Sequence, residues 1–316
     1  MRADDVSLHV LQRPFPPDFV EFYPYTRTEV LGPERAGWRG WLCRVIEEGV
    51  PGVTDRMIAA RDTTTGEWVG VVWTSVSLSC PELAHFGWFY VAARCQGIGV
   101  GGRVIATCLD TLGAEGVRMI MLPTLIENER AVGMYYRRGW QLSIVDPRGG
   151  VWMVREPAGF YEQTFTPDPQ RPIRAGEPQP SDFVALDYLL SRPASSVRLL
   201  PLELVGNRRF ISFIHDWDGA RHMVARQGGC PMALAVAVEE DTGSKLDVFG
   251  LDRRAMAVAV TELADSVGRP WAEVAATDGR RRMALEDAGF RLEGSRSKTI
   301  AGAQIALCRY VRQTGQ

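Results

Sequence analysis

The chain has 316 residues, of which 46% are hydrophobic and 23% charged, and its net charge at pH 7 is −2. That balance is typical of a folded globular protein, and it argues against a chain built to hold nucleic acid, which usually carries a basic excess. The length accommodates one large domain or two of ordinary size. No apolar run is long enough to cross a bilayer, and the N-terminus lacks the apolar core of a signal peptide. We therefore expect a cytoplasmic protein without membrane or nucleic-acid partners.

The first half of the chain predicts a definite order of elements. Apolar residues at helical spacing in WRGWLCRVIEEG, residues 38–49, predict a helix. Residues 56–61 and 67–78 predict two antiparallel strands joined by the tight turn DTTTG, and the aromatic-rich residues 83–91 predict a third strand. The strand leads into RCQGIGVGGR, residues 94–103, which has four glycines within six residues.

The elements that follow complete a mixed pattern. Apolar residues at helical spacing from 104 to 112 predict a helix, and residues 117–125 predict a buried strand. Residues 128–139 predict a short helix with Asn128 as its N-cap and Gly139 at its C-terminal end. Residues 140–145 and 150–156 predict two closing strands. Strand, glycine loop, helix, strand, helix and strand in this order indicate a mixed α/β fold.

Prolines crowd residues 157–180 and predict an extended connection between two folded units. We therefore expect a first domain over residues 1–156, a linker over residues 157–180 and a second domain over residues 181–316.

The second domain repeats the end of the first. DGRRRMALEDAGFRL, which begins at Asp278, aligns with NERAVGMYYRRGWQL, which begins at Asn128, at an offset of 150. Upstream, Gly250 would stand opposite Gly99. A repeat of this length indicates a duplicated domain, because solenoid repeats are much shorter.

The cysteines show neither a C-x-x-C pair nor a regular spacing: Cys43, Cys80, Cys95, Cys108, Cys230 and Cys308. With only four histidines in the chain, this pattern contains no zinc-site signature, and we predict no metal. Free thiols in a reducing compartment are the expected state. Cys95 lies at the glycine segment, but the sequence offers no partner that would activate it as a nucleophile.

The glycine segment stands between a strand and a helix, as phosphate-binding loops do. A P-loop needs G-x-x-x-x-G-K-[ST], and no lysine follows here. GIGVGG, residues 97–102, has the G-x-G-x-x-G spelling of a dinucleotide site. However, no acidic residue ends a second strand about 20 residues later, and the segment does not open the fold. The dinucleotide site stays open as an alternative.

A third pattern spans more of the chain. Arg94 to Gly99 has the form R-x-x-G-x-G. The motif N-x-x-A-x-x-x-Y-x-x-x-G-[FW] follows downstream at Asn128, Ala131, Tyr135 and Gly139-Trp140. Together the two patterns resemble the acyl-CoA signature of the GCN5-related N-acetyltransferases, the GNAT superfamily. The resemblance covers residues 55–155, and the second unit in degraded form. It implies two tandem GNAT-like domains, each a mostly antiparallel twisted sheet flanked by helices.

The resemblance also implies that acetyl-CoA is the co-substrate. Backbone amides of the glycine segment would hold the CoA pyrophosphate. The strand at residues 89–91 would splay from its neighbour and pair with the pantetheine arm, and one of its N–H groups would stabilise the oxyanion. The implied CoA-binding residues are Phe89, Tyr90, Val91, Arg94, Gln96, Gly97, Ile98, Gly99, Val100, Gly101, Gly102, Asn128 and Ala131.

Two residues carry the implied chemistry. Tyr135 would protonate the departing CoA thiolate as a general acid, although a core position is a competing explanation. The attacking amine must lose a proton, and Glu82 and His85 are candidates on the strand before the loop. We name His85 as the base because the ordinary pKa of histidine suits the task. Water as the base and a purely structural histidine remain alternatives.

The second domain has lost key residues, since Leu285 stands opposite Tyr135 and cannot donate a proton. Arg253 and Arg254 stand where phosphates would approach. We therefore expect a non-catalytic copy that supports the first domain or walls its acceptor pocket. Aromatic residues near the N-terminus would line the acceptor site or pack in the core: Phe15, Phe19, Phe22, Tyr23, Tyr25, Trp38 and Trp41.

The sequence thus predicts an N-acetyltransferase, monomeric or homodimeric, that moves an acetyl group from acetyl-CoA to a primary amine of a small metabolite. An antibiotic or its precursor is one candidate acceptor. Transfer would be direct, within a ternary complex. A protein lysine or N-terminal acetyltransferase and a non-catalytic acyl-CoA-binding sensor are the alternatives. A longer donor such as malonyl- or succinyl-CoA is a further open point.

Overall fold

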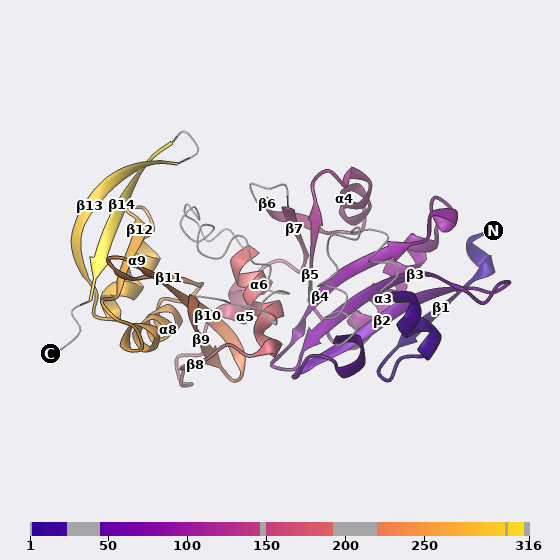
Figure 1. Cartoon of the computed structure of the whole chain (residues 1–316), viewed down its shortest axis with the longest axis horizontal. Helices are drawn as coiled ribbons and strands as arrows, with labels where there is room; N and C mark the ends of the chain where they lie inside the picture. Colours follow the sequence, from indigo (N-terminus) through magenta and orange to yellow (C-terminus); the bar gives the residue numbers. More distant parts are fainter. Residues whose placement is uncertain (1, 24–44, 146–149, 192–219, 301–302, 313–316) are drawn as a thin grey trace.

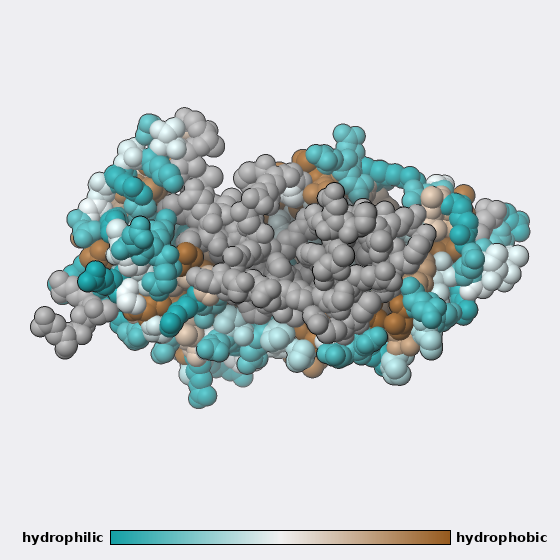
Figure 2. Space-filling model, viewed as in Figure 1, coloured by the Kyte–Doolittle hydropathy of each residue, from teal (hydrophilic) through white to brown (hydrophobic). Residues whose placement is uncertain are grey.

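The computed structural model describes residues 2–23, 45–145, 150–191, 220–300 and 303–312. Within them the chain forms two seven-stranded sheets, with helices beside and between them (Figure 1). No helix in these ranges is both long and apolar enough to cross a membrane. On the face shown in Figure 2, hydrophilic residues dominate the described surface, and hydrophobic residues form only small patches.

The first sheet, with the helices packed on it, is called the first unit. Its strands are β1 (Val6–Leu11), β2 (Val53–Asp62), β3 (Trp68–Ser77), β4 (Cys80–Val91), β5 (Met119–Leu125), β6 (Gln141–Val145) and β7 (Gly150–Arg155). Their order in space is β1-β2-β3-β4-β5-β7-β6. Every neighbouring pair is antiparallel except β4 and β5, which are parallel. The predicted strands of this half are therefore confirmed, and β1 is an additional edge strand.

Helices cover the first sheet because their apolar residues recur on one face. The regular helices are α3 (Val100–Ala114) and α4 (Glu129–Tyr136), with the short 3-10 turns η1 (Ala3–Asp5) and η3 (Ala93–Cys95). Residues 17–23 and 45–48 are also helical. In α3, the residues Val100, Val104 and Cys108 are buried against the sheet at four-residue spacing. As a result, β3 is buried along its whole length.

The second unit repeats this topology. Its strands are β8 (Arg174–Gly176), β9 (Ala220–Gln227), β10 (Cys230–Glu240), β11 (Gly243–Gly250), β12 (Trp271–Ala275), β13 (Arg291–Ile300) and β14 (Ala303–Val311). Their order is β8-β9-β10-β11-β12-β14-β13, which matches the first sheet strand for strand. Its helices are α8 (Arg253–Asp265) and α9 (Gly279–Asp287). Two like mixed α/β units in tandem confirm the predicted fold class.

Between the sheets lie α5 (Phe160–Phe165), η4 (Pro180–Asp182) and α6 (Phe183–Ser191) (Figure 1). Helix α6 contacts β3 and β4 of the first unit and β10 and β11 of the second. One buried apolar cluster runs from Met121 through Leu186 to Leu234, so the two units share part of a core. The segment predicted as a linker thus contains α5 and β8. The domain boundaries at residues 156 and 181 stay a prediction.

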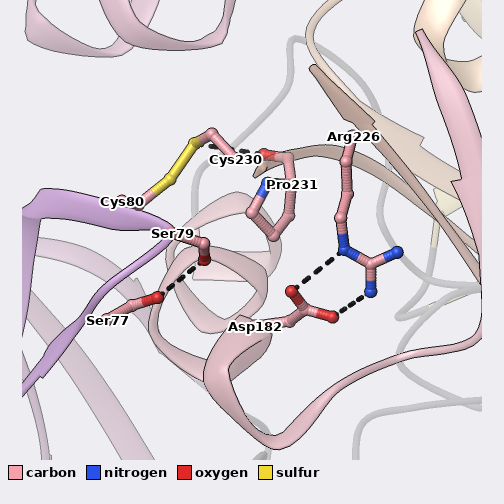
Figure 3. The surroundings of a disulfide bond; sticks show 7 residues. All are labelled: Ser77, Ser79, Cys80, Asp182, Arg226, Cys230 and Pro231. Carbon is pink, nitrogen blue, oxygen red and sulfur yellow. Dashed lines mark hydrogen bonds and ion pairs between the residues drawn. A yellow bond between two sulfur atoms is a disulfide. The ribbon is translucent and has the colours of Figure 1, made fainter. Parts of the chain in front are cut away.

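A disulfide joins Cys80, at the start of β4, to Cys230, at the start of β10 (Figure 3). The expectation of free thiols throughout is wrong for this pair. The two residues are 150 positions apart in the chain, and only the packing of the two sheets brings their Cα atoms to 5.2 Å. Three further cysteines are free and buried: Cys95, Cys108 and Cys308. Cys43 lies outside the described residues.

A buried ion pair accompanies the disulfide. Arg226 of β9 pairs with Asp182 of η4, whose carboxylate is only 1% exposed (Figure 3). The same carboxylate accepts a hydrogen bond from the backbone N–H of Gln179 at 2.7 Å. The segment that connects the two units is therefore anchored on the second sheet by a charged pair, next to the covalent link to the first.

Candidate functional site

The parallel pairing of β4 with β5 is short. It joins residues 83–85 to residues 119–121, and no bridge between the described strands joins residues 86–91 to residues 122–125. We call this diverging stretch the splay. Backbone N–H and C=O groups that have no partner in the adjacent strand can pair with an extended ligand. The strand divergence that the family resemblance implied at residues 89–91 is thus a feature of the sheet.

A glycine loop closes one end of the splay. Gly97 and Gly99 have φ angles of +81° and +96°, in the left-handed region that side-chain-bearing residues rarely adopt. Gly99 is the N-cap of α3, and no side chain caps the first turn of this helix. Uncapped N–H groups and the positive end of the helix dipole together form a site for an anion such as a phosphate.

The next two glycines stand where a side chain would approach neighbouring side chains. A Cβ atom on Gly101 would lie 3.0 Å from Phe89, and one on Gly102 would lie 2.7 Å from a guanidinium nitrogen of Arg138. Gly101 therefore allows α3 to pack closely against Phe89 of β4, and Gly102 leaves room for the Arg138 side chain, which follows α4. The packing also holds the charge of Arg138 beside the first turn of α3. From the sequence alone, Arg138 is expected only to interact with the dipole of α4. Its contact with Gly102 cannot be predicted, because the two residues are far apart in the chain.

Gln96 connects the loop to α4. Its side-chain amide donates to the carbonyl of Val91 at 2.9 Å and accepts from the guanidinium of Arg130 at 3.3 Å. The end of β4 is thereby tied to α4 across the splay. Arg94, in contrast, pairs with Glu67 in the turn before β3, and both side chains are more than half exposed. Arg94 was predicted to bind CoA, and in the structure its side chain is engaged by Glu67.

The hydrophobic residues of the loop, Ile98 and Val100, face the core. Val100 is 1% exposed, and Ile98 packs against the cluster between α3 and the sheet. Their side chains are thus turned inward, and what the loop offers at this point is its backbone.

Helix α4 borders the opposite side of the splay. Asn128 is its N-cap, as predicted, and accepts a hydrogen bond from the backbone N–H of Ala131 at 3.3 Å. Tyr135 is 5% exposed, and its ring packs at 5.7 Å against both Phe86 and Trp140. Phe86 is the first β4 residue beyond the last bridge to β5. Tyr135 therefore lies at the inner end of the splay.

A β-bulge interrupts β4 within the splay. Val71 pairs with Tyr90 and Trp73 with Gly87, so two β4 residues face one residue of β3. Trp88 in the bulge has a φ of +58°, which is an outlier for a bulky residue and costs about 1–3 kcal/mol. Such bulges commonly lie next to active sites. The sequence signal that indicates it is Gly87, because a glycine inside a strand often marks a bulge.

His85 lies against this bulge. Its ring carbon Cε1 would be 2.6 Å from a Cβ atom on Gly87, and its ring centroid is 5.7 Å from that of Phe183 in α6. Burial lowers the pKa of His85 from 6.5 to about 4, so the imidazole is neutral at neutral pH. Its Nε2 has no hydrogen-bond partner among the described residues. Glu82, the other candidate base, pairs with Arg118 at 3.3 Å.

Aromatic side chains cover the β3–β4 face that carries His85. Three of the predicted acceptor-site aromatics are buried there, namely Phe15, Phe19 and Tyr23, and Phe22 is partly buried. Tyr25, Trp38 and Trp41 lie outside the described residues. A buried carboxylate on this face, Asp55, accepts hydrogen bonds from Trp73, Ser75 and Arg13 at 2.6–2.8 Å. The Asp55 carboxylate therefore has hydrogen-bond donors on both of its oxygens, and it fixes these three side chains.

The thiol of Cys95 is unsuited to nucleophilic catalysis. Cys95 is fully buried, and burial raises the pKa of its thiol, so it stays protonated at neutral pH. In the part of the chain that is described, no three His, Cys, Asp or Glu side chains are grouped to hold a metal.

The second unit has the same short parallel pairing, because only Lys245 and Leu246 of β11 pair with β12, but it differs at the bulge, the helix N-terminus and the space beside α9. The register of β10 with β11 runs without a bulge from Ala233–Gly250 to Glu240–Gly243. Only two residues join β11 to α8. One of them, Asp252, caps α8 by accepting from the N–H groups of Arg254 and Ala255 at 2.9 and 3.0 Å. Asp252, and not Gly250, thus takes the place of Gly99, and a carboxylate of the chain occupies this helix terminus.

Charged residues also close the space between β11 and α9. Arg281, which aligns with Ala131, is 6% exposed and pairs with Asp247 of β11 at 3.0 Å and with Asp278 at 2.8 Å. Leu285, which aligns with Tyr135, is buried. The second unit therefore keeps the strand order, and charged or bulky side chains stand at the positions that match Gly99, Ala131 and Tyr135 of the first.

The Acetyltransferase (GNAT) family matches residues 17–140. The first unit is a GNAT domain. Solved structures similar to the chain include a GNAT-family protein from Desulfovibrio desulfuricans, with 16% identity over 48% of this chain and 98% of that one and a TM-score of 0.40. Escherichia coli ElaA has 16% identity over 48% and 99%, with a TM-score of 0.38. The PaiA N-acetyltransferase of Thermoplasma acidophilum, in complex with coenzyme A, has 12% identity over 48% and 99%, with a TM-score of 0.37. No curated protein matches the sequence.

Within the GNAT domain, the two sequence motifs lie on either side of the splay. The glycine loop with Gln96 stands at the end of β4, and Asn128 and Tyr135 stand on α4. The chain thus has an arrangement of strand, loop and helix that fits the acyl-transfer activity of the family. The second unit shares its strand order, consistent with a tandem arrangement.

Proposed function

We propose that the GNAT domain transfers an acetyl group from acetyl-CoA to the primary amine of a small molecule. The observation that carries this proposal is the splay, with an uncapped helix N-terminus at one end and Tyr135 at the other. The residues fit acetyl-CoA as a substrate. The loop amides and Arg138 suit its phosphates, and the open edges of β4 and β5 suit the pantetheine amides.

The proposed reaction is direct transfer within a ternary complex. The amine nitrogen attacks the acetyl carbonyl carbon, and a backbone N–H at the bulge stabilises the oxyanion that forms. The carbon–sulfur bond then breaks, and Tyr135 gives its proton to the CoA thiolate. The proton of the amine passes to His85 or to water. The protonated Cys95 supports direct transfer over a route through an acetylated thiol.

The packing of the second unit supports a small acceptor. Helix α6 lies on β3 and β4, and its Phe183 contacts His85 next to the bulge. A protein tail would need an open groove at this place. A small-molecule amine, with an antibiotic or its precursor as one candidate, therefore fits better than a lysine in a folded protein. We further propose a cytoplasmic monomer or homodimer that binds one acetyl-CoA per chain.

The test is to incubate the full-length protein with acetyl-CoA and a panel of primary amines, including a lysine peptide. Thiol release and the mass of the acetylated product are measured. Release that depends on a small amine, with the matching product, supports the proposal. Acetylation of the peptide alone would favour the protein acetyltransferase alternative. Binding of acetyl-CoA without transfer to any amine would favour the sensor.

A further inference from the structure

The backbone of Val91, the last residue of β4, faces the splay. Ala92, which follows it, donates its N–H to the carbonyl of Val69 in β3 at 2.8 Å, and Val91 itself is in register with Gly70 of β3. Because the backbone groups of successive strand residues point to opposite edges of the strand, the N–H and C=O of Val91 point away from β3. No described strand pairs with residue 91 on that side. These two groups are therefore placed to pair with an extended ligand.

The side chain of Gln96 already occupies one of these groups. Its Nε2 donates to the carbonyl oxygen of Val91 at 2.9 Å, and its Oε1 accepts from the guanidinium of Arg130 at 3.3 Å. Val91 ends β4 and Arg130 belongs to α4, so the carboxamide is held from both sides of the splay. We call these two hydrogen bonds together the Gln96 bridge.

The Gln96 bridge places an amide where a donor would place one. The pantetheine arm of acetyl-CoA carries amides, and in the proposed function it runs along β4 beside α4. An amide N–H of this arm and the carboxamide of Gln96 are the same kind of donor for the carbonyl of Val91. A donor that takes up this position therefore displaces Gln96, and the hydrogen bonds of the bridge are lost when the donor binds.

The bridge can open without disturbing the core. Gln96 and Arg130 are both exposed, and neither belongs to a buried cluster. Gly97, the next residue, has a φ of +81°, and a Cβ atom there would meet no atom within 4 Å. The backbone beside Gln96 thus has the conformational freedom of glycine and free space around it.

We infer that Gln96 is an internal competitor of the thioester donor. Its carboxamide closes the splay in the free protein and leaves Val91 when acetyl-CoA binds. Gln96 therefore lowers the affinity for the donor and equally for the product CoA, which favours product release after transfer. The family resemblance implied instead that Gln96 binds CoA. This inference rests on the proposed binding of acetyl-CoA along β4.

The test measures the Kd of acetyl-CoA and of CoA by calorimetry on the full-length protein. The variants are Gln96→Ala, which removes the bridge, and Gln96→Leu, which removes its hydrogen bonds and keeps most of the side-chain volume. Gln141→Ala is the matched control, since Gln141 is also an exposed glutamine but begins β6. Stopped-flow mixing gives the association rate for each variant.

Gln96→Ala and Gln96→Leu should each bind acetyl-CoA and CoA about fivefold more tightly, the scale of one hydrogen bond that no longer has to be broken. Association should be no slower than in the wild type, and Gln141→Ala should change nothing.

Three outcomes would overturn the inference and leave acetyl transfer standing. Weaker binding by the Gln96 variants would make the side chain a contact of the bound donor. An unchanged Kd would show that the bridge does not oppose binding, and tighter binding by Gln96→Ala alone would indicate crowding without a role for the hydrogen bonds. Failure of the wild type to bind acetyl-CoA would instead contradict the proposed function itself.

Discussion

The guanidinium of Arg281 donates to the carboxylate of Asp247 at 3.0 Å inside the second unit. Burial raises the pKa of Asp247 and the charge of Arg281 opposes that rise, so each group depends on the other. Breaking a buried pair by removing one partner costs about 3–5 kcal/mol. We expect Arg281→Ala to lower the stability of the second unit and to leave the affinity for acetyl-CoA unchanged. Thermal unfolding with and without acetyl-CoA measures both. A marked loss of acetyl-CoA affinity would place part of its site in the second unit.

Tyr135→Phe should separate binding from chemistry. The phenylalanine keeps the ring contacts with Phe86 and Trp140, but it cannot donate a proton. We expect kcat to fall about 100-fold, the scale of a lost general acid, while the Kd for acetyl-CoA stays the same. Tyr136→Phe is the matched control, because Tyr136 is 47% exposed on the same helix. Equal activity in the two variants would remove Tyr135 from the mechanism.

His85 should make stability depend on pH. Its pKa is about 4 in the folded protein and near 6.5 when the chain unfolds. Between these values the unfolded state binds more protons, so stability is full above pH 6.5 and falls as the pH drops towards 4. The loss reaches about 3 kcal/mol. We expect His85→Gln to flatten this fall, measured as the free energy of unfolding in urea at pH 7 and pH 4.5. His9→Gln serves as control, and an identical fall in wild type and His85→Gln would refute the assignment.

Arg138→Gln should weaken binding of the CoA phosphates. Arg138 lies against Gly102 in the first turn of α3, where its charge adds to that of the helix terminus. We expect the Kd for acetyl-CoA to rise about tenfold, which is about 1.4 kcal/mol, and the difference to shrink at high salt. Acetyl-pantetheine, which lacks these phosphates, should bind the two proteins equally. The exposed Arg137 on the same turn supplies the matched Arg137→Gln control, and equal effects of the two variants would argue against a specific contact.

The Cys80–Cys230 disulfide should stabilise the join between the units. Closing a loop of this length lowers the entropy of the unfolded chain and is worth up to about 5 kcal/mol in the chain-entropy model. We expect Cys80→Ser to lower the unfolding midpoint by the same amount as a reducing agent does in the wild type. A variant with Cys108→Ser, which removes a buried free thiol, should keep its response to reductant. A midpoint of the wild type that reductant leaves unchanged would show that the bond does not contribute.

Much of the first unit follows from local sequence patterns. Alternation and helical spacing predicted β2 to β7 and the helices α3 and α4, and a capping residue predicted the start of α4 at Asn128. These signals are local, because each depends on residues within one element. The two motifs on either side of the splay were visible for the same reason.

What the sequence could not show depends on contacts between remote segments. The disulfide of Cys80 with Cys230 and the position of Arg138 beside Gly102 exist only because separate elements pack together. The alignment of the two units upstream of α8 could not be predicted either. The loop before this helix has only two residues, so Asp252 replaces Gly99 at the helix terminus. A simple offset in the sequence cannot reveal such a deletion.

The most direct test of the central claim is calorimetric titration of acetyl-CoA into the wild type and two matched variants, Gly97→Asp and Gly97→Asn. Aspartate and asparagine both tolerate the left-handed conformation of Gly97, and a Cβ atom there meets no atom within 4 Å. They differ only in the negative charge. The account predicts one site per chain in the wild type, retained in Gly97→Asn and weakened about tenfold or more in Gly97→Asp. No binding by the wild type, or equal affinity of the two variants, would contradict it.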